Sequence, residues 1–163
     1  MPSPDQHNWV SYFSAIMSSC VATMALWVAS RQSKTNMAKL RLDLYDKRFA
    51  IYENTLGFFQ VLGGGTESLQ TDAFVAAQRS FMKSYRESQF LFDDDSGVFE
   101  LLGKINVDAY KVIASKTRAR EMPGAHAIKL VAEANDVYAT IDKSVNDLER
   151  AISPYIRFNK ALI

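Results

Sequence analysis

The residues that could hold a metal ion or carry catalysis are few and scattered. Cys20 is the only cysteine, which excludes an internal disulfide and a cysteine-based zinc site. Asp93 and Asp95 have the spacing of the first and third ligands of a calcium loop. That loop needs glycine and a bidentate glutamate where this chain has Val98 and Lys104. We therefore interpret the acidic run as an N-cap for the helix that follows.

The two histidines also lack partners. His7 precedes the apolar N-terminal segment, His126 follows a Met-Pro-Gly turn, and no Glu-x-x-His pair of a di-metal bundle is present. The Leu62–Thr66 segment (LGGGT) lacks the lysine and following hydroxyl residue of a phosphate-binding loop. We therefore expect no catalytic residue, no metal and no cofactor, with an enzyme as the minor alternative.

One cluster of basic residues could bind an anionic partner. Lys111, Lys116, Arg118 and Arg120 lie toward the end of the third helix expected below. A solvated helix terminus is the favoured alternative. The chain has 19 basic and 18 acidic residues, so its overall charge indicates no nucleic-acid partner, and no small-molecule substrate is evident.

These residues belong to a chain that begins with a long apolar segment. Residues 9–30 carry no charge and, as a helix, are long enough to cross a hydrocarbon core of roughly 30 Å. A cleaved signal is disfavoured because residues 1–8 contain no Lys or Arg and no cleavage site follows. Six Ser and Thr residues leave open a buried helix of a soluble protein. Hydroxyls can bond to the carbonyl four residues earlier, so we predict a transmembrane helix over 9–30.

The flanking charges predict the orientation of this span. Basic residues follow it and none precedes it, so residues 1–8 are expected outside and the bulk of the chain in the cytoplasm. The expected interfacial anchors are Trp9, Tyr12, Trp27, Arg31 and Lys34.

Small residues follow one face of the predicted span at alternating four- and three-residue spacing. They are Ser11, Ala15, Ser18, Ala22, Ala25 and Ala29. Because packing drives helix association in lipid, this face could support self-association or docking of a partner. The alternative is an anchor whose alanines have no further role.

Periodicity in the remaining sequence predicts an all-α fold. After a stalk over 31–40 we expect an antiparallel bundle of about four helices over 41–154. The first helix ends at Leu62, and the second runs from an N-cap at Thr71 to about Phe92. The third begins near Val98 and is stopped by Pro123 and Gly124, and the fourth runs from about Ala125, with Ile128 pointing inward, until Pro154. The first helix has a second apolar stripe that includes Ile51, Phe58 and Leu62. Residues 155–163 form an amphipathic tail that either packs on the bundle or touches lipid. The predicted core consists of Leu42, Tyr45, Phe49, Tyr52, Leu56, Phe59, Phe81, Tyr85, Leu102, Ile105, Tyr138, Val145 and Leu148.

Two segments carry a resemblance to known proteins. AKLRLDLYDKRFAIYE (38–53) and SQFLFDDD (88–95) are similar to segments of small, uncharacterised bacterial proteins with one N-terminal span. The resemblance implies a bacterial inner-membrane location and this architecture, and it implies no activity. The leading hypothesis is a membrane-anchored module that binds another protein or its own copies. The alternative is a self-assembling, membrane-active effector of the toxin or phage-defence type that uses the small-residue face.

Overall fold

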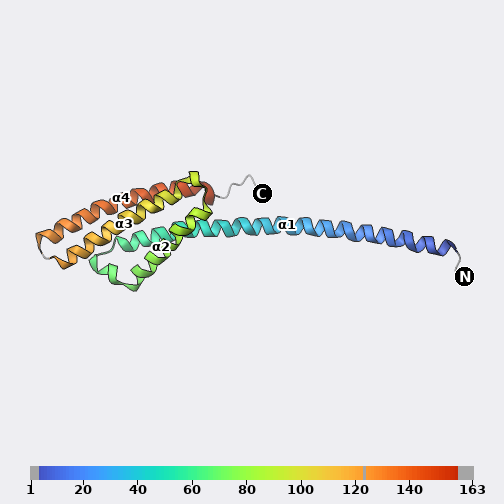
Figure 1. Cartoon of the computed structure of the whole chain (residues 1–163), viewed down its shortest axis with the longest axis horizontal. Helices are drawn as coiled ribbons and strands as arrows, with labels where there is room; N and C mark the ends of the chain where they lie inside the picture. The colour runs from blue at the N-terminus through green and yellow to red at the C-terminus, as the bar shows by residue number, and fades with distance from the viewer. Residues whose placement is uncertain (1–3, 123, 158–163) are drawn as a thin grey trace. The chain divides into compact units, whose positions relative to one another are not determined.

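The computed structural model in Figure 1 describes residues 4–122 and 124–157, and within these ranges the chain is helical with no strand. Four α-helices run over Pro4–Leu62 (α1), Asp72–Leu91 (α2), Val98–Glu121 (α3) and Ala125–Ile156 (α4). Short 3₁₀ helices, η1 and η2, occupy Thr66–Gln70 and Asp94–Ser96. The chain divides into two units, Met1–Asp43 and Leu44–Ile163, so α1 contributes to both.

The ends of α2 lie close to the predicted positions. The Thr71 hydroxyl accepts a hydrogen bond from the Phe74 backbone N–H at 3.2 Å, which satisfies one of the free N–H groups of the first turn. α2 ends at Leu91, next to the predicted Phe92.

The start of α3 corrects the interpretation of the acidic run. Gly97, with φ of +67°, is the N-cap, and no aspartate caps the helix. Asp94–Ser96 form η2, which places the carboxylates ahead of the cap position. The Ser96 hydroxyl instead accepts from the Val98 backbone N–H at 3.3 Å. Glycine suits this cap because a left-handed φ is strained for residues with a β-carbon.

One hydrophobic core lies inside the second unit and receives side chains from all four α-helices. The deepest α1 residues are Ile51, Thr55, Phe58 and Leu62, all at most 2 % exposed. The second apolar stripe of α1, which includes Ile51, Phe58 and Leu62, therefore faces the centre of the core. The buried Thr55 hydroxyl donates to the Ile51 carbonyl at 2.7 Å, which makes a polar residue acceptable there.

The predicted core residues divide into three groups. Phe81, Leu102, Ile105, Val145 and Leu148 are buried. Seven others are half-buried: Tyr52, Leu56, Phe59, Tyr85 and Tyr138, which pack against the core, and Tyr45 and Phe49, which stack on each other. The prediction is wrong for Leu42, which lies in the first unit and is 50 % exposed. Aromatic rings with a hydroxyl fit the edge because the ring packs while the hydroxyl reaches a polar partner.

Ring and backbone contacts connect the helices of the second unit. Phe58 of α1 packs on Phe74 and stacks on Phe81 of α2, with ring centroids 6.0 and 4.8 Å apart. Near the other end of α2, the Arg48 Nε of α1 donates to the Leu91 carbonyl at 2.8 Å. Tyr85 of α2 stacks on Phe99 of α3 at 4.9 Å. α3 and α4 lie side by side in Figure 1.

α4 differs from expectation near both ends. Ile128, expected to point inward, is 74 % exposed. Pro154 does not end the helix, which continues to Ile156. Tyr155 and Ile156 of the predicted tail pack against the core. Residues 158–163 of that tail lie outside the described ranges.

Candidate functional site

The apolar segment of α1 is exposed along its length in the first unit. Every residue from Ser11 to Asp43 is exposed, including the large side chains of Tyr12, Phe13 and Trp27. Within the described ranges α1 is the one helix long and apolar enough to cross a membrane. By length and composition alone, a signal sequence near an N-terminus passes the same test. An exposed apolar helix of this length needs an apolar environment to cover it.

Hydroxyl groups within this segment bond back to the helix. The Thr23 hydroxyl donates to the Ser19 carbonyl at 2.6 Å and lies 3.1 Å from the Cys20 carbonyl. Such local bonds satisfy polar groups without water, which is the condition for placing them in lipid.

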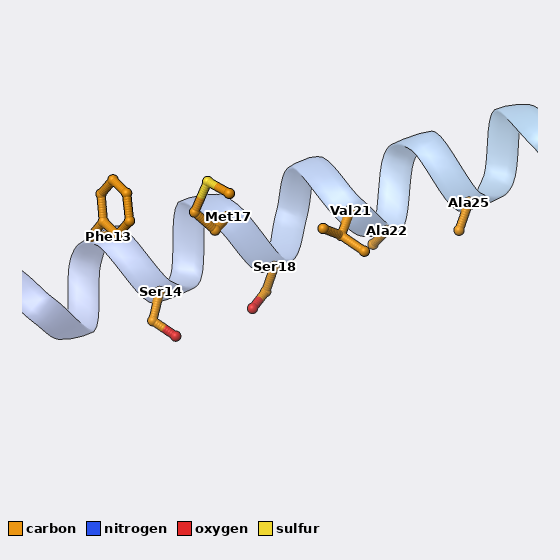
Figure 2. A pocket seen from close by; sticks show the side chains of 7 residues that line it. All are labelled: Phe13, Ser14, Met17, Ser18, Val21, Ala22 and Ala25. Atoms are coloured by element: carbon orange, nitrogen blue, oxygen red, sulfur yellow. The ribbon is translucent and has the colours of Figure 1, made fainter.

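Three of the six small residues predicted as a packing face line a shallow open depression on α1. Ser18, Ala22 and Ala25 form it together with Phe13, Ser14, Met17 and Val21. Figure 2 shows Ser14, Ser18 and Ala25 on one side of the helix and Phe13 and Met17 on the other. Ser11, Ala15 and Ala29 are exposed on the same helix outside this depression. The small side chains leave the helix backbone open to close approach by another helix.

The predicted anchor residues lie at the two ends of the uncharged segment. Trp9 stacks on Phe13 with ring centroids 5.9 Å apart. Near the other end the Arg31 guanidinium lies 4.7 Å above the Trp27 ring. Tyr12 is 72 % exposed, and Lys34 is also exposed. A cation held over an indole ring is a polar and aromatic combination suited to a membrane interface.

A groove between α1 and α2 in the second unit was missed by the sequence analysis. α1 contributes Lys47, Ala50, Ile51 and Asn54, and α2 contributes Lys83, Ser84, Glu87, Phe90 and Leu91. Asn54 Nδ2 donates to the Ser84 hydroxyl at 2.9 Å across the groove. Phe90 is 81 % exposed, which is unusual for a phenylalanine. One signal in the sequence could have indicated its exposure. Phe90 lies between Ser88 and Phe92, which are buried, and therefore falls off the inward face of α2.

Lys116 does not belong to the surface cluster of basic residues that was predicted to bind an anionic partner. This residue is 5 % exposed, and its ammonium donates to the Leu62 carbonyl at 2.7 Å and also to the Gly64 carbonyl. Its burial lowers its pKa. Lys111 Nζ pairs with Asp108 Oδ1 at 2.7 Å, while Arg118 and Arg120 are exposed. Lys116 thus holds the end of α1 and is not available to a partner.

Arg48 organises the region where α1, α2 and α4 meet. Its guanidinium lies 5.7 Å from the Phe92 ring and 5.0 Å from the Tyr155 ring. The Tyr155 hydroxyl donates to Asp93 Oδ2 at 3.3 Å. Desolvation and the Asp93 carboxylate raise the Tyr155 pKa. These contacts give Asp93, one of the three residues of the acidic run, a structural role.

The described part of the chain contains no group of three metal-ligating side chains, and His126 is exposed. His7 lies where side chains are outside the described set. No family model matches the chain, and neither a curated protein nor a solved structure matches it.

Proposed function

We propose that the chain is a single-pass protein of the bacterial inner membrane whose cytoplasmic unit binds another protein. In this proposal residues 9–30 span the membrane, residues 1–8 lie outside, residues 31–40 form a stalk, and residues 41–154 form an antiparallel bundle in the cytoplasm. No residue is assigned a catalytic role. The observation that carries the proposal is the exposed apolar segment of α1, which only lipid or another apolar surface can cover.

The contacts of the second unit support the antiparallel bundle. Arg48, early in this part of α1, contacts Leu91 at the end of α2, whereas the later Phe58 contacts Phe74 near the start of α2. The Tyr138 hydroxyl of α4 donates to the Phe59 carbonyl at 3.2 Å, and Tyr52 approaches Glu149. As residue numbers rise along α1, the numbers of its contact residues in α2 and α4 fall. Contacts in this order are those of antiparallel neighbours, as in bundles with short connections.

The groove between α1 and α2 supports binding of a protein. Exposed aromatic side chains beside a cleft are typical of the residues that dominate protein interfaces. Phe90 is such a residue, and Lys47, Lys83 and Glu87 provide a polar rim around Ile51 and Leu91. Lys83 Nζ and Glu87 Oε1 are 3.8 Å apart and both exposed, so a partner can compete for either at little cost.

The orientation is tested by cysteine labelling in intact cells. In a Cys20→Ser background, one variant carries Ser3→Cys and another carries Ser115→Cys. A membrane-impermeant maleimide should label the first in intact cells and the second only after lysis. Labelling of position 115 in intact cells would overturn the orientation, and recovery of the chain in the soluble fraction would overturn the span.

The partner site is tested with a photo-crosslinking amino acid in place of Phe90 in native membranes. A matched control carries it at Val107, which is exposed on α3. We expect one dominant crosslinked protein from position 90 and not from position 107. Equal crosslinking patterns from both positions would contradict the groove as the binding site.

A second candidate is the membrane-active effector, and the depression on α1 favours it because Ser14 and Ser18 bring hydroxyls to a surface where spans could pack. Controlled expression with a membrane-potential dye separates the two functions. Depolarisation that is lost in Ala22→Leu/Ala25→Leu would support the effector, whereas an unchanged potential at high expression would rule it out.

A further inference from the structure

The apolar segment of α1 is followed by a stretch that carries only positive charge. Between Asp5 and Asp43 the chain has no aspartate or glutamate. The basic residues of this interval all follow Ser30 and are all exposed: Arg31, Lys34, Lys39 and Arg41. None of them forms an ion pair with a residue in the described part of the chain. The stretch therefore offers an uncompensated positive surface to an anionic partner.

A shallow depression lies where the apolar segment meets this basic stretch. Its lining changes along the helix from apolar to charged to neutral polar residues: Trp27, Val28, Arg31, Gln32, Thr35 and Asn36. They form two neighbouring rows at four-residue spacing, so they share one side of α1. A phospholipid presents its groups in the same order, from acyl chain through phosphate to polar headgroup.

The polar side chains of this depression have donors available for a ligand. The Arg31 guanidinium lies 4.7 Å above the Trp27 ring, an attraction that uses none of its N–H groups, so these can still contact phosphate oxygens. The Thr35 hydroxyl donates to the Arg31 carbonyl at 3.1 Å. The side chains of Gln32 and Asn36 have no hydrogen bond to any described residue. Two amide groups therefore remain for a polar headgroup.

The positions of the four cations fit a membrane whose hydrocarbon core ends near Ser30. With a rise of about 1.5 Å per residue, Arg31 and Lys34 lie within about 6 Å of that boundary, inside a headgroup layer about 5–7 Å thick. Lys39 and Arg41 lie about 14–17 Å from it. Side chains of a helix lean toward its N-terminus, which is the membrane side here, so both can reach back toward the headgroups.

We propose that residues 27–41 of α1 bind anionic phospholipids with hydroxyl-bearing headgroups, such as phosphatidylglycerol. The proposal rests on the span proposed above and adds a lipid preference to it. Arg31 and Lys34 contact the phosphate of a bound lipid. The more distant Lys39 and Arg41 attract further anionic headgroups.

The neutral part of the depression favours this lipid over other anions. Trp27 and Val28 offer a surface for an acyl chain, which a free phosphate ion cannot use. Gln32 and Asn36 offer amide groups to headgroup hydroxyls, which phosphatidylcholine lacks. Residues 1–8, at the opposite end of the span, contain no Lys or Arg. The preference is therefore confined to the end of the span that leads into the second unit.

The strength of this preference depends on charge and therefore on salt. Each basic residue close to an anionic surface favours binding by up to about fivefold. We expect phosphatidylglycerol to be preferred over phosphatidylcholine by at least about threefold at low salt. The preference should fall toward equality at high salt, because the Debye length falls from about 10 Å at 0.1 M to about 3 Å at 1 M.

The two tryptophans of the chain provide one fluorescent probe at each end of the span. Trp9→Phe leaves Trp27 beside the proposed site, and Trp27→Phe leaves Trp9 at the other end. Each full-length variant is reconstituted into phosphatidylcholine vesicles that contain a minor share of phosphatidylglycerol. A bromine label, which quenches tryptophan on contact, is carried either by the phosphatidylglycerol or by an equal amount of phosphatidylcholine. Labelled phosphatidylglycerol should quench Trp27 at least about threefold more effectively, whereas both labelled lipids should quench Trp9 equally.

Charge neutralisation gives the decisive comparison in the chain that retains Trp27. Arg31→Gln/Lys34→Gln removes the two cations nearest the phosphate and should bring the preference close to equality. Lys39→Gln/Arg41→Gln should give a smaller loss, because these side chains lie farther from the headgroups. A preference that survives the first change, or a larger loss from the second, would contradict the assigned contacts.

A matched control neutralises two arginines on another helix. Arg79→Gln/Arg86→Gln removes the same net charge from exposed positions of α2 and should leave the preference unaltered. An equal loss in this control would mean that net charge alone sets the preference, and would overturn the site. Sodium phosphate should lower the preference no more than sodium chloride of the same ionic strength. A larger effect of phosphate would show that the site takes a free anion and not a lipid.

The outcomes also separate this site from the proposed span. If neither labelled lipid quenches Trp9 or Trp27, the segment lies outside the bilayer and both proposals fail. Equal quenching of Trp27 by the two labelled lipids would overturn the lipid preference alone and leave the span intact.

Discussion

At the scale of single residues, Lys116 is a buried charged side chain that connects α3 to the end of α1. Its ammonium supplies donors to the Leu62 and Gly64 carbonyls, where α1 ends and has no further intrahelical partners. Replacing it with methionine keeps most of the volume and removes both donors. We expect Lys116→Met to lower the unfolding free energy by about 1–3 kcal/mol, measured by denaturant unfolding of the full chain in detergent.

Lys104→Met on the exposed side of the same helix is the control, and its effect should stay within about 0.5 kcal/mol. An unchanged or higher stability of Lys116→Met would mean that the cost of burying the charge outweighs its hydrogen bonds.

The same lysine gives a pH dependence of defined sign. Burial disfavours its charged form, so its folded-state pKa lies below the ordinary 10.5 of the unfolded chain. Between these two values the unfolded chain holds more protons, and the unfolding free energy contributed by Lys116 rises with pH. The stability difference between wild type and Lys116→Met should therefore increase as the pH approaches 10.5. A difference that shrinks over this window would contradict the sign.

At the scale of elements, the second apolar stripe of α1 is buried more deeply than the stripe that was predicted as core. Phe58 is 2 % exposed and packs against Phe74 and Phe81, whereas Phe49 is half-buried between Tyr45 and Tyr52. Phe58→Ala should cost about 3–5 kcal/mol of unfolding free energy, because it leaves a cavity among rings. Phe49→Ala should cost below about 2 kcal/mol, since less area is removed from water. Denaturant midpoints of the two variants check the order, and the reverse order would refute the assignment.

The turn after α1 provides a second test at this scale. A β-carbon on Gly63 would lie 2.8 Å from Cζ of Tyr138, whose ring stacks on Phe59 at 4.5 Å. Gly63→Ala must displace this ring and weaken its hydrogen bond to the Phe59 carbonyl, at a cost of about 1–3 kcal/mol. Gly65→Ala meets no atom within 4 Å and has an extended backbone, so it should be neutral or slightly stabilising. Thermal unfolding of both variants measures the contrast, and equal melting temperatures would argue against close packing at Gly63.

At the scale of the whole molecule, the proposed span determines where the chain is found. Removing residues 1–30 deletes the uncharged segment and leaves the second unit, whose core lies entirely within Leu44–Ile163. The full chain should stay in the membrane pellet after alkaline extraction, whereas the truncated chain should move to the soluble fraction. Retention of the truncated chain in the pellet would show that another surface binds lipid.

The sequence by itself determined the helical content, the breaks at the glycine run and at the acidic run, and the apolar N-terminal segment. Each of these depends on local properties: the 3.6-residue period, backbone entropy at glycine, and uninterrupted apolar length. Thr71 was identified as a cap for the same reason, because its partner is the N–H of Phe74 in the next turn.

Only the tertiary structure decided which of two apolar stripes of α1 is the more deeply buried and which charged residues are exposed. α1 has apolar residues on two sides, and the choice between them depends on how α2, α3 and α4 pack around Ile51 and Phe58. Lys116 reads as a surface residue until the end of α1 supplies carbonyls from more than fifty positions earlier in the chain. The groove beside Phe90 likewise exists only because α1 and α2 meet. Such features arise from contacts distant in sequence, which no local pattern encodes.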